Sequence, residues 1–437
     1  MAALHDGTMV LRTLACCVVV TSTWSFAEEP FDAGLPEEAT TGAGGLTEAL
    51  PQPDAGVPPG VAAPVDAGVE APKFTLSAKL GEGVTFRSGD YSLNLRGRVQ
   101  VQAMALVPTE GSTATRANTL TVRRARLNLK GELPYHLSWA LQLGFAGNDL
   151  EADAPNPLRD FYVTWNRWRD LSVRGGQMKV PFDVQRVVSS ANLQMVDRSA
   201  ATLELNLDRD VGLVLFSDDL FGWGQRLRYA IGVWQGDGRN RIGTNIGLLY
   251  SARLRFSPFG ALDDKLEGDL ERSSKFRLAI GGGVARNIAS NRPRSTSGTP
   301  FKLPGGFDLT HATGDVHLKW YGLSLLGELY WRQADTDSRT GTVSGATLTE
   351  YSRSGWGWFV QAGGFVTPWL EFTGRYGDLQ PLGMTDPTFT RTREVGGGAN
   401  FFLFKHDLKL QADYFWLDDG TGHNGRHQVR VIAQLFF

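Results

Sequence analysis

Apolar and polar residues alternate along most of the chain from Tyr91 onward, in segments of about ten residues. Successive side chains of an extended strand point to opposite faces, so this alternation predicts strands with one apolar and one polar face. Many such segments in a row are typical of a membrane β-barrel, whose outer surface contacts lipid and whose inner surface contacts water. We count sixteen, and the expected strands begin near Tyr91, Thr119, His136, Leu158, Leu171, Arg209, Gln225, Gly243, Ser274, Leu309, Gly322, Gly355, Trp369, Thr390, His406 and Arg426.

The lengths of the links between these segments support the same fold. Bacterial barrels have an even number of strands, short periplasmic turns and longer external loops. Short links such as 134–135 and 169–170 alternate with long ones such as 180–208 and 335–354. Two links depart from the rule: 257–273 is a long, charged link on the periplasmic side, and the external link near Asp237 is short. The predicted fold class is therefore all-β, a transmembrane antiparallel β-barrel of sixteen strands.

The C-terminal segment is amphipathic and ends in an aromatic residue. Val429, Val431, Ala433, Leu435 and Phe437 form one apolar face. A last strand of this kind is commonly read by the machinery that assembles outer-membrane barrels. We therefore expect that machinery to recognise Phe437, and the barrel to contact outer-membrane lipid.

The N-terminal region has a different composition. Residues 1–27 resemble a secretory signal peptide, with Arg12, a short apolar core and Ser25-Phe26-Ala27 as the cleavage site. Residues 28–72 are rich in Pro, Ala and Gly and contain nine acidic residues and no Lys or Arg, which predicts a disordered linker. The barrel is expected from residue 73 to residue 437. Both cysteines lie in the signal peptide, so the mature chain has no thiol for a disulfide or a metal.

Charge distribution changes the picture of the barrel interior. From residue 73 onward the chain holds 43 Lys and Arg against 36 Asp and Glu. If the apolar positions face lipid, the alternating polar positions face the lumen. This places basic residues inside, and the candidates on the expected strands are Arg96, Arg98, Arg124, Arg126, Lys130, Arg226 and Arg228. An excess of positive charge inside a low-dielectric wall concentrates anions. The alternative is that these residues pair with luminal acids and add rigidity rather than selectivity.

The longest external link, 180–208, contains many apolar residues, among them Val187, Leu193 and Met195. Such a loop is not expected to extend into water. We expect it to fold into the lumen and to narrow the pore, with Lys179, Arg186 and Arg198 near the constriction. A lid packed at a subunit interface is the alternative.

Four short segments resemble the phosphate-selective porin O and P family. They are Arg123-Arg124-Ala125-Arg126, the run from Gly176 to Phe182, Arg209-Asp210-Val211-Gly212 and the run from Gly232 to Asn240. The resemblance implies a homotrimer of sixteen-stranded barrels in the bacterial outer membrane, with an inward third loop and cations that guide phosphate or polyphosphate. The residues corresponding to the basic residues of the family are Arg98, Arg123, Arg124, Arg126 and Lys179. The third loop of this chain departs from the family pattern because it holds few lysines.

Two other functions compete with an anion porin. A general or sugar-permeable porin would lack phosphate specificity, and a sugar channel would need an aromatic track. An outer-membrane enzyme would need a nucleophile activated by a base. His317 is expected in the lumen near Asp315, but no serine motif accompanies it. Motifs for a metal, a nucleotide cofactor or a nucleic-acid partner are likewise absent. We therefore expect no enzymatic activity and no cofactor.

Overall fold

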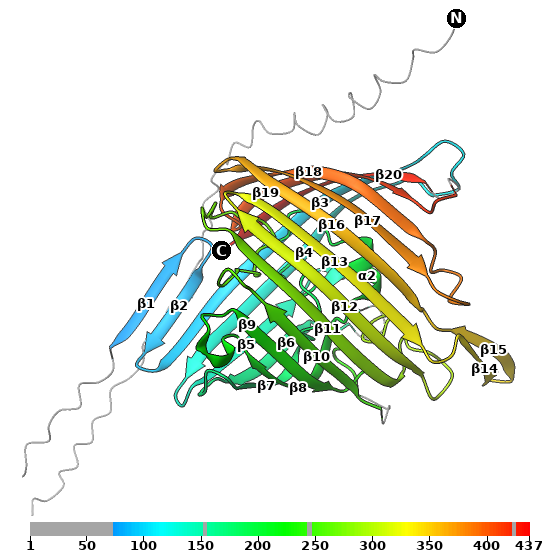
Figure 1. Ribbon diagram of the computed structural model, residues 1–437, viewed down its shortest axis with the longest axis horizontal. Helices are drawn as coiled ribbons and strands as arrows, with labels where there is room; N and C mark the ends of the chain where they lie inside the picture. Colours follow the sequence, from blue (N-terminus) through cyan, green and yellow to red (C-terminus); the bar gives the residue numbers. More distant parts are fainter. Residues whose placement is uncertain (1–72, 152–154, 243–246, 422–424) are drawn as a thin grey trace, which may run out of the picture. The chain divides into compact units, whose positions relative to one another are not determined.

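Sixteen antiparallel strands form a closed barrel in the computed structural model, which describes residues 73–151, 155–242, 247–421 and 425–437. The last strand pairs with the first, from Arg426 opposite Pro108 to Phe436 opposite Arg98 (Figure 1). The strands are β3 (Tyr91–Pro108), β4 (Ala117–Leu133), β5 (Leu137–Gly144), β6 (Leu158–Trp165), β7 (Ser172–Lys179), β8 (Arg209–Ser217), β9 (Leu227–Trp234), β10 (Leu249–Phe256), β11 (Arg277–Ser290), β12 (Phe307–Trp320), β13 (Leu323–Ala334), β16 (Gly355–Thr367), β17 (Leu370–Pro381), β18 (Thr392–Phe404), β19 (Leu408–Asp418) and β20 (Arg426–Phe436). Closure leaves the barrel without a free edge of unpaired backbone groups.

The predicted fold class is confirmed. Fifteen of the sixteen expected strand beginnings lie within three residues of the observed ones. The exception is the eighth strand: its expected beginning, Gly243, is outside the described residues, and the observed strand, β10, begins at Leu249. The expected signal peptide, 1–27, and linker, 28–72, also lie outside the described residues.

The two faces of the wall follow the predicted alternation. Val101, Leu120 and Leu213 are exposed on the outside, whereas Gln100 and Gln411 are buried on the inside. An apolar outer surface of this kind suits contact with hydrocarbon. None of the helices in the described ranges is long and apolar enough to cross a membrane.

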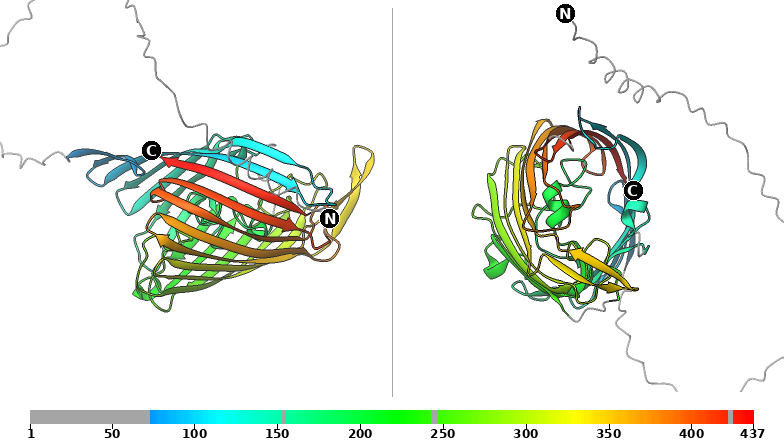
Figure 2. Two further views of the ribbon diagram at one scale, coloured as in Figure 1. Left: turned by 90° about the horizontal axis from the view of Figure 1, so that it is seen from above. Right: turned by 90° about the vertical axis from the view of Figure 1, so that its right-hand side faces the viewer.

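Two hairpins and a short helix were not predicted. The hairpin of β1 (Phe74–Lys79) and β2 (Gly83–Ser88) pairs with the first five residues of β3 and extends the sheet beyond the barrel (Figure 1). A second hairpin, β14 (Ser338–Val343) and β15 (Ala346–Tyr351), forms within an external loop. The helix α2 (Ala200–Leu205) lies inside the ring of strands (Figure 2). This helix has only six residues and lies within a loop, so it is too short to produce a helical periodicity in the sequence.

Candidate functional site

The loop between β7 and β8, residues 180–208, runs through the interior of the barrel. Most of its apolar side chains are buried, including Val180, Val188 and Leu193, whereas Val187 and Leu203 are exposed. Ser199 begins α2, because its hydroxyl accepts a hydrogen bond from the Thr202 amide at 3.0 Å. Such a cap satisfies a backbone donor at the start of a helix that has only six residues. We call residues 180–208 the constriction loop.

Strands β13 to β20 hold the constriction loop through their luminal polar side chains. Glu328 accepts a hydrogen bond from the Val184 amide at 2.6 Å, and Asp413 accepts one from the Val196 amide at 2.9 Å. Lys409 donates to the Leu193 carbonyl at 3.1 Å. A loop that leaves water must find partners for its backbone groups, and these side chains supply them. This wall therefore serves to anchor the loop.

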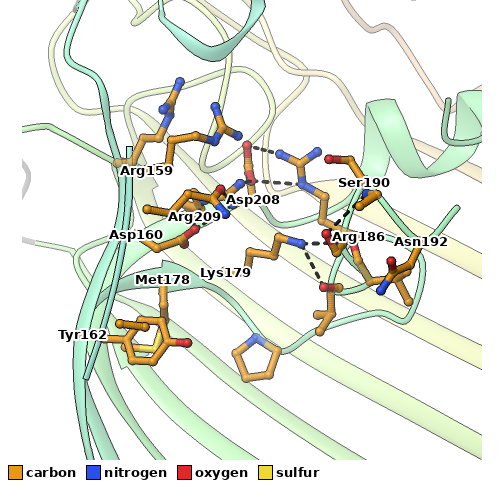
Figure 3. Close-up of a pocket in the computed structure, with 18 of the residues that line it drawn as sticks. Arg159, Asp160, Tyr162, Met178, Lys179, Arg186, Ser190, Asn192, Asp208 and Arg209 are labelled. Atoms are coloured by element: carbon orange, nitrogen blue, oxygen red, sulfur yellow. Dashed lines mark hydrogen bonds and ion pairs between the residues drawn. The ribbon is translucent and has the colours of Figure 1, made fainter. Parts of the chain in front are cut away.

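The opposite wall, from β3 to β10, faces a cavity of about 1100 Å3 between the barrel and the constriction loop (Figure 3). The cavity reaches from external residues such as Glu151 and Thr299 to Arg96 and Lys130, which also border a smaller cavity beside β2. Among the described residues, eighteen Arg and Lys line the larger cavity against seven Asp and Glu. Three more acids, Asp149, Asp315 and Asp407, contact lining arginines although they are not part of the lining. Lining Arg and Lys still outnumber the acids when these three are added.

Two irregularities in strand pairing direct arginines into the cavity. On β4, Arg124 pairs with Gln100 and Val122 pairs with Val101, which leaves Arg123 as the extra residue. On β6, Asp160 pairs with Gln142 and Leu158 pairs with Leu143, so Arg159 is the extra residue. A bulge places two successive residues opposite one and changes which face they serve. Both members of each pair, Arg123 with Arg124 and Arg159 with Asp160, thus line the cavity.

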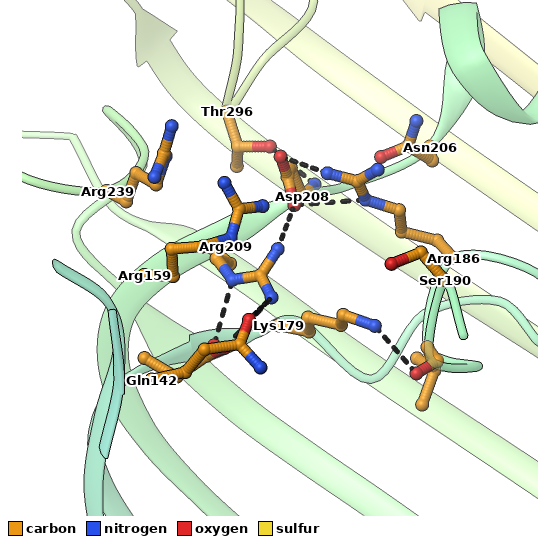
Figure 4. A network of polar contacts seen from close by, with 12 residues as sticks. Gln142, Arg159, Lys179, Arg186, Ser190, Asn206, Asp208, Arg209, Arg239 and Thr296 are labelled. Atoms are coloured by element: carbon orange, nitrogen blue, oxygen red, sulfur yellow. Dashed lines mark hydrogen bonds and ion pairs between the residues drawn. The ribbon is translucent and has the colours of Figure 1, made fainter. Parts of the chain in front are cut away.

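Several lining cations contact carboxylates. Arg126 donates to Asp149 at 2.6 Å, and Arg209 donates to Asp160 at 2.9 Å. Arg186 pairs with Asp208 on the constriction loop (Figure 4). These ion pairs fix the positions of the guanidinium groups and remove part of their net charge.

Asp197 of the constriction loop contacts both bulge arginines of β4. Its carboxylate lies 2.6 Å from Arg123 and 3.6 Å from Arg124. Burial by itself would raise the pKa of Asp197, but Arg124, Arg123 and Arg430 outweigh it and hold that pKa well below its ordinary value. Asp197 is therefore ionised at neutral pH.

Three other cations have no carboxylate within 4 Å among the described residues. Arg98 donates to the Ser190 hydroxyl at 3.1 Å, and Lys179 donates to the Val187 and Val188 carbonyls at 2.8 and 3.1 Å (Figure 3). Arg198 donates to the Gln185 and Val188 carbonyls at 2.9 and 2.8 Å. Burial lowers the pKa of Arg198 to about 10, so it stays charged at neutral pH. We call Arg98, Lys179 and Arg198 the unpaired cations, because they contact hydroxyl and carbonyl oxygens beside the cavity rather than carboxylates.

Most of the basic residues that we expected in the pore lining from the sequence do line the cavity. They are Arg96, Arg98, Arg123, Arg124, Arg126, Lys130, Lys179, Arg186, Arg198 and Arg228. Arg226 is an exception, since it is exposed just before β9 and is not part of the lining. Arg96 pairs with Asp407 and lies 3.6 Å above the Phe436 ring, while Arg228 pairs with Asp264 at 3.0 Å.

Sequence reasoning missed several lining residues, including Arg159, Arg209 and Arg239. Arg159 has the same parity as the outward-facing Phe161 and Val163, so strict alternation places it in lipid. The adjacent charges Arg159-Asp160 were the available signal, because two successive charged residues cannot both obey alternation. Arg239 lies in an external link, where no periodicity applies.

Comparisons with known proteins agree with this architecture. Residues 93–435 match the family model of phosphate-selective porins O and P. No curated protein matches the chain. OmpF of Salmonella typhi is 13% identical over 80% of this chain and 98% of its own, with a TM-score of 0.51. The channel DcaP of Acinetobacter baumannii is 13% identical over 80% and 99%, with a TM-score of 0.50. An anion-selective porin from Comamonas acidovorans is 16% identical over 79% and 100%, with a TM-score of 0.49.

Identities this low show a shared fold and nothing finer, whereas the family match spans most of the chain. The protein belongs to the phosphate-selective porin O and P family and is a porin of the bacterial outer membrane.

Proposed function

We propose that this porin conducts small anions, with phosphate or polyphosphate as the favoured class, along the arginine-rich wall of β3 to β10. The observation that carries the proposal is the lining itself, which contains eighteen Arg and Lys against seven Asp and Glu among the described residues. Fields focus inside a low-dielectric wall, so this excess raises the local concentration of anions and lowers that of cations.

The unpaired cations are the proposed binding groups at the narrowest part. Their contacts are neutral hydroxyl or carbonyl oxygens, which orient Arg98, Lys179 and Arg198 without cancelling their charge. A guanidinium offers two donors in one plane and suits two oxygens of one phosphate. An entering phosphate can therefore exchange its hydration water for donors that already point toward the cavity.

A sugar-permeable pore is less well supported. Four aromatic rings border the cavity among the described residues, and guanidinium groups cover three of them. Arg174 lies 4.7 Å from both the Tyr162 and the Phe216 ring centroids, and Arg96 covers Phe436. Rings covered in this way offer little free face for stacking against a sugar.

We also propose that the barrel domain comprises residues 73–437 and assembles as a homotrimer in outer-membrane lipid. In this proposal the assembly machinery recognises the barrel through Phe437, and the lumen serves as a channel and not as a catalytic site.

Phosphate block of chloride current through single channels tests the proposal. Lys179→Gln keeps a donor for the Val187 and Val188 carbonyls but removes the charge. We expect the half-blocking phosphate concentration to rise about fivefold, which corresponds to ~1 kcal/mol. Lys405→Gln, in an exposed periplasmic turn, is the matched control and should leave block unchanged. Equal block in both variants and the wild type would rule out Lys179 as a phosphate-binding group.

A further inference from the structure

The link between β10 and β11, residues 257–276, turns into the lumen from the periplasmic end. Leu262 and Glu267 within it are 3% and 0% exposed. Periplasmic connections of such barrels are usually short turns that stay outside. A long link that buries a carboxylate inside the barrel therefore needs a structural reason.

The link meets the constriction loop inside the barrel. One oxygen of Glu267 accepts a hydrogen bond from the Gln185 side chain at 3.1 Å, and the other accepts one from the Gln194 amide at 2.8 Å. The second oxygen also accepts from Gln361 of β16 at 2.9 Å. Beside it, Asn192 donates to the Lys265 carbonyl at 3.0 Å. A single buried carboxylate thus joins the link, the loop and the wall.

The wall also holds the link independently of the loop. Lys319 of β12 donates to the Asp263 and Leu266 carbonyls at 2.5 and 2.8 Å. Asp269 accepts a hydrogen bond from the Gly322 amide at 2.7 Å. Because β12 and the turn that follows it hold the link on both sides of Glu267, the link can act as a rigid support for the constriction loop.

We propose that residues 257–276 are a second pore-shaping segment and that Glu267 is a positioning residue, which holds the constriction loop at a fixed distance from the arginine wall. Residues 187–192 of that loop carry the carbonyls bound by Lys179 and the Ser190 hydroxyl bound by Arg98. The contacts between the periplasmic link and the constriction loop therefore set the distances between the unpaired cations. The effect on phosphate rests on the proposed function, whereas the effect on loop rigidity does not.

Glu267→Gln tests this role with little change of shape. The new amide presents hydrogen atoms where the carboxylate accepted them, so at least one donor loses its partner in a buried site. Glu271→Gln is the control, because Glu271 is an exposed carboxylate of the same link without a described contact. We expect Glu267→Gln channels to show at least a threefold increase in open-channel current noise and a similar rise in half-blocking phosphate. Glu271→Gln channels should match the wild type.

A double variant distinguishes positioning from general damage. In Gln185→Glu with Glu267→Gln, the new amide donates to the new carboxylate and its oxygen still accepts from Gln194 and Gln361. The Gln185 oxygen that now accepts from Ser199 and Thr202 remains an acceptor as glutamate. We expect wild-type noise and block in this double variant.

Noise of Glu267→Gln equal to that of Glu271→Gln would overturn the proposal, as would failure of the double variant to restore quiet channels. A wild-type channel without phosphate block would instead refute the phosphate part of the proposed function, and the noise comparison would still decide the role of Glu267.

Discussion

The Asp197 carboxylate accepts a hydrogen bond from Arg123 at 2.6 Å, between the constriction loop and the bulge of β4. The other carboxylate oxygen lies 3.6 Å from Arg124. The loop thereby places an anionic group where two adjacent guanidinium groups could bind a permeating anion. Asp197 acts as a resident counter-ion, so the net charge of this part of the wall depends on one loop residue.

Asp197→Asn should strengthen anion binding, because it leaves Arg123 and Arg124 without their carboxylate. We expect the half-blocking phosphate concentration to fall about fivefold, again ~1 kcal/mol. Single-channel recordings in chloride with added phosphate measure this. Glu110→Gln removes an exposed carboxylate of an external loop and serves as the control. Weaker block in Asp197→Asn would contradict the counter-ion role.

Acidification should not mimic that substitution. The depressed pKa of Asp197 means that its charge is present above the ordinary carboxyl range and is lost only well below it. Wild-type half-blocking concentrations, corrected for the ionisation of phosphate itself, should therefore stay within about twofold between pH 8 and pH 5. A fivefold strengthening of block near pH 5 would show that Asp197 takes up a proton there.

Asp264 of the periplasmic link plays a comparable part at the other end of the cavity. It lies 3.0 Å from Arg228 and 3.3 Å from Arg255. Burial would raise the pKa of Asp264, but Arg228 and Arg255 lower it by more than burial raises it. The carboxylate is therefore charged at neutral pH. Asp264→Asn should move the reversal potential in a potassium chloride gradient further toward that of chloride. Asp263→Asn, on an exposed neighbour outside the lining, should leave it unchanged; identical shifts in both variants would argue against a local role for Asp264.

Glu204 of α2 should matter for stability. Its carboxylate contacts Arg332 at 2.7 Å, Arg353 at 2.8 Å and Arg294 at 2.8 Å. Removing one partner of a buried ion pair costs about 3 kcal/mol, so we expect Glu204→Gln to lower the free energy of unfolding in urea by that amount. The exposed pair Arg87–Glu132 gives the control, Glu132→Gln, for which we expect less than about 1 kcal/mol.

The pH dependence of the Glu204 effect follows from its pKa. Burial would raise that pKa, but the three arginines lower it below the ordinary value. The stabilisation is therefore complete above the unfolded carboxyl pKa and is lost as pH falls through the folded one. The difference between wild type and Glu204→Gln should be constant from pH 8 to pH 6 and should shrink below about pH 4. A difference that grows on acidification would contradict this assignment.

Alternation along the strands was sufficient to predict the barrel and much of its lining. Arg98, Arg124 and Arg126 face the cavity as parity predicts, because a strand buried between lipid and water leaves only one arrangement of faces. The short strands β1 and β2 were missed, although the turn at Gly81 and Gly83, both with positive φ, was a signal for a hairpin.

The details of the site could not be predicted in the same way. Arg123 and Arg159 face the cavity through bulges, which shift register without a fixed sequence pattern. The partner of Arg123 is Asp197, which is 74 residues away in an irregular loop. The sequence also left unexplained why the link 257–273 is long, and its contacts with the constriction loop supply the reason.

The most direct test of an anion pore is the reversal potential of the wild-type porin in a planar bilayer under a tenfold potassium chloride gradient. The excess of lining arginines predicts a potential of the sign set by chloride, with chloride at least about ten times as permeant as potassium. A potential near zero, or one of the sign set by potassium, would contradict the account, because the lining charge would then not govern the ions that pass.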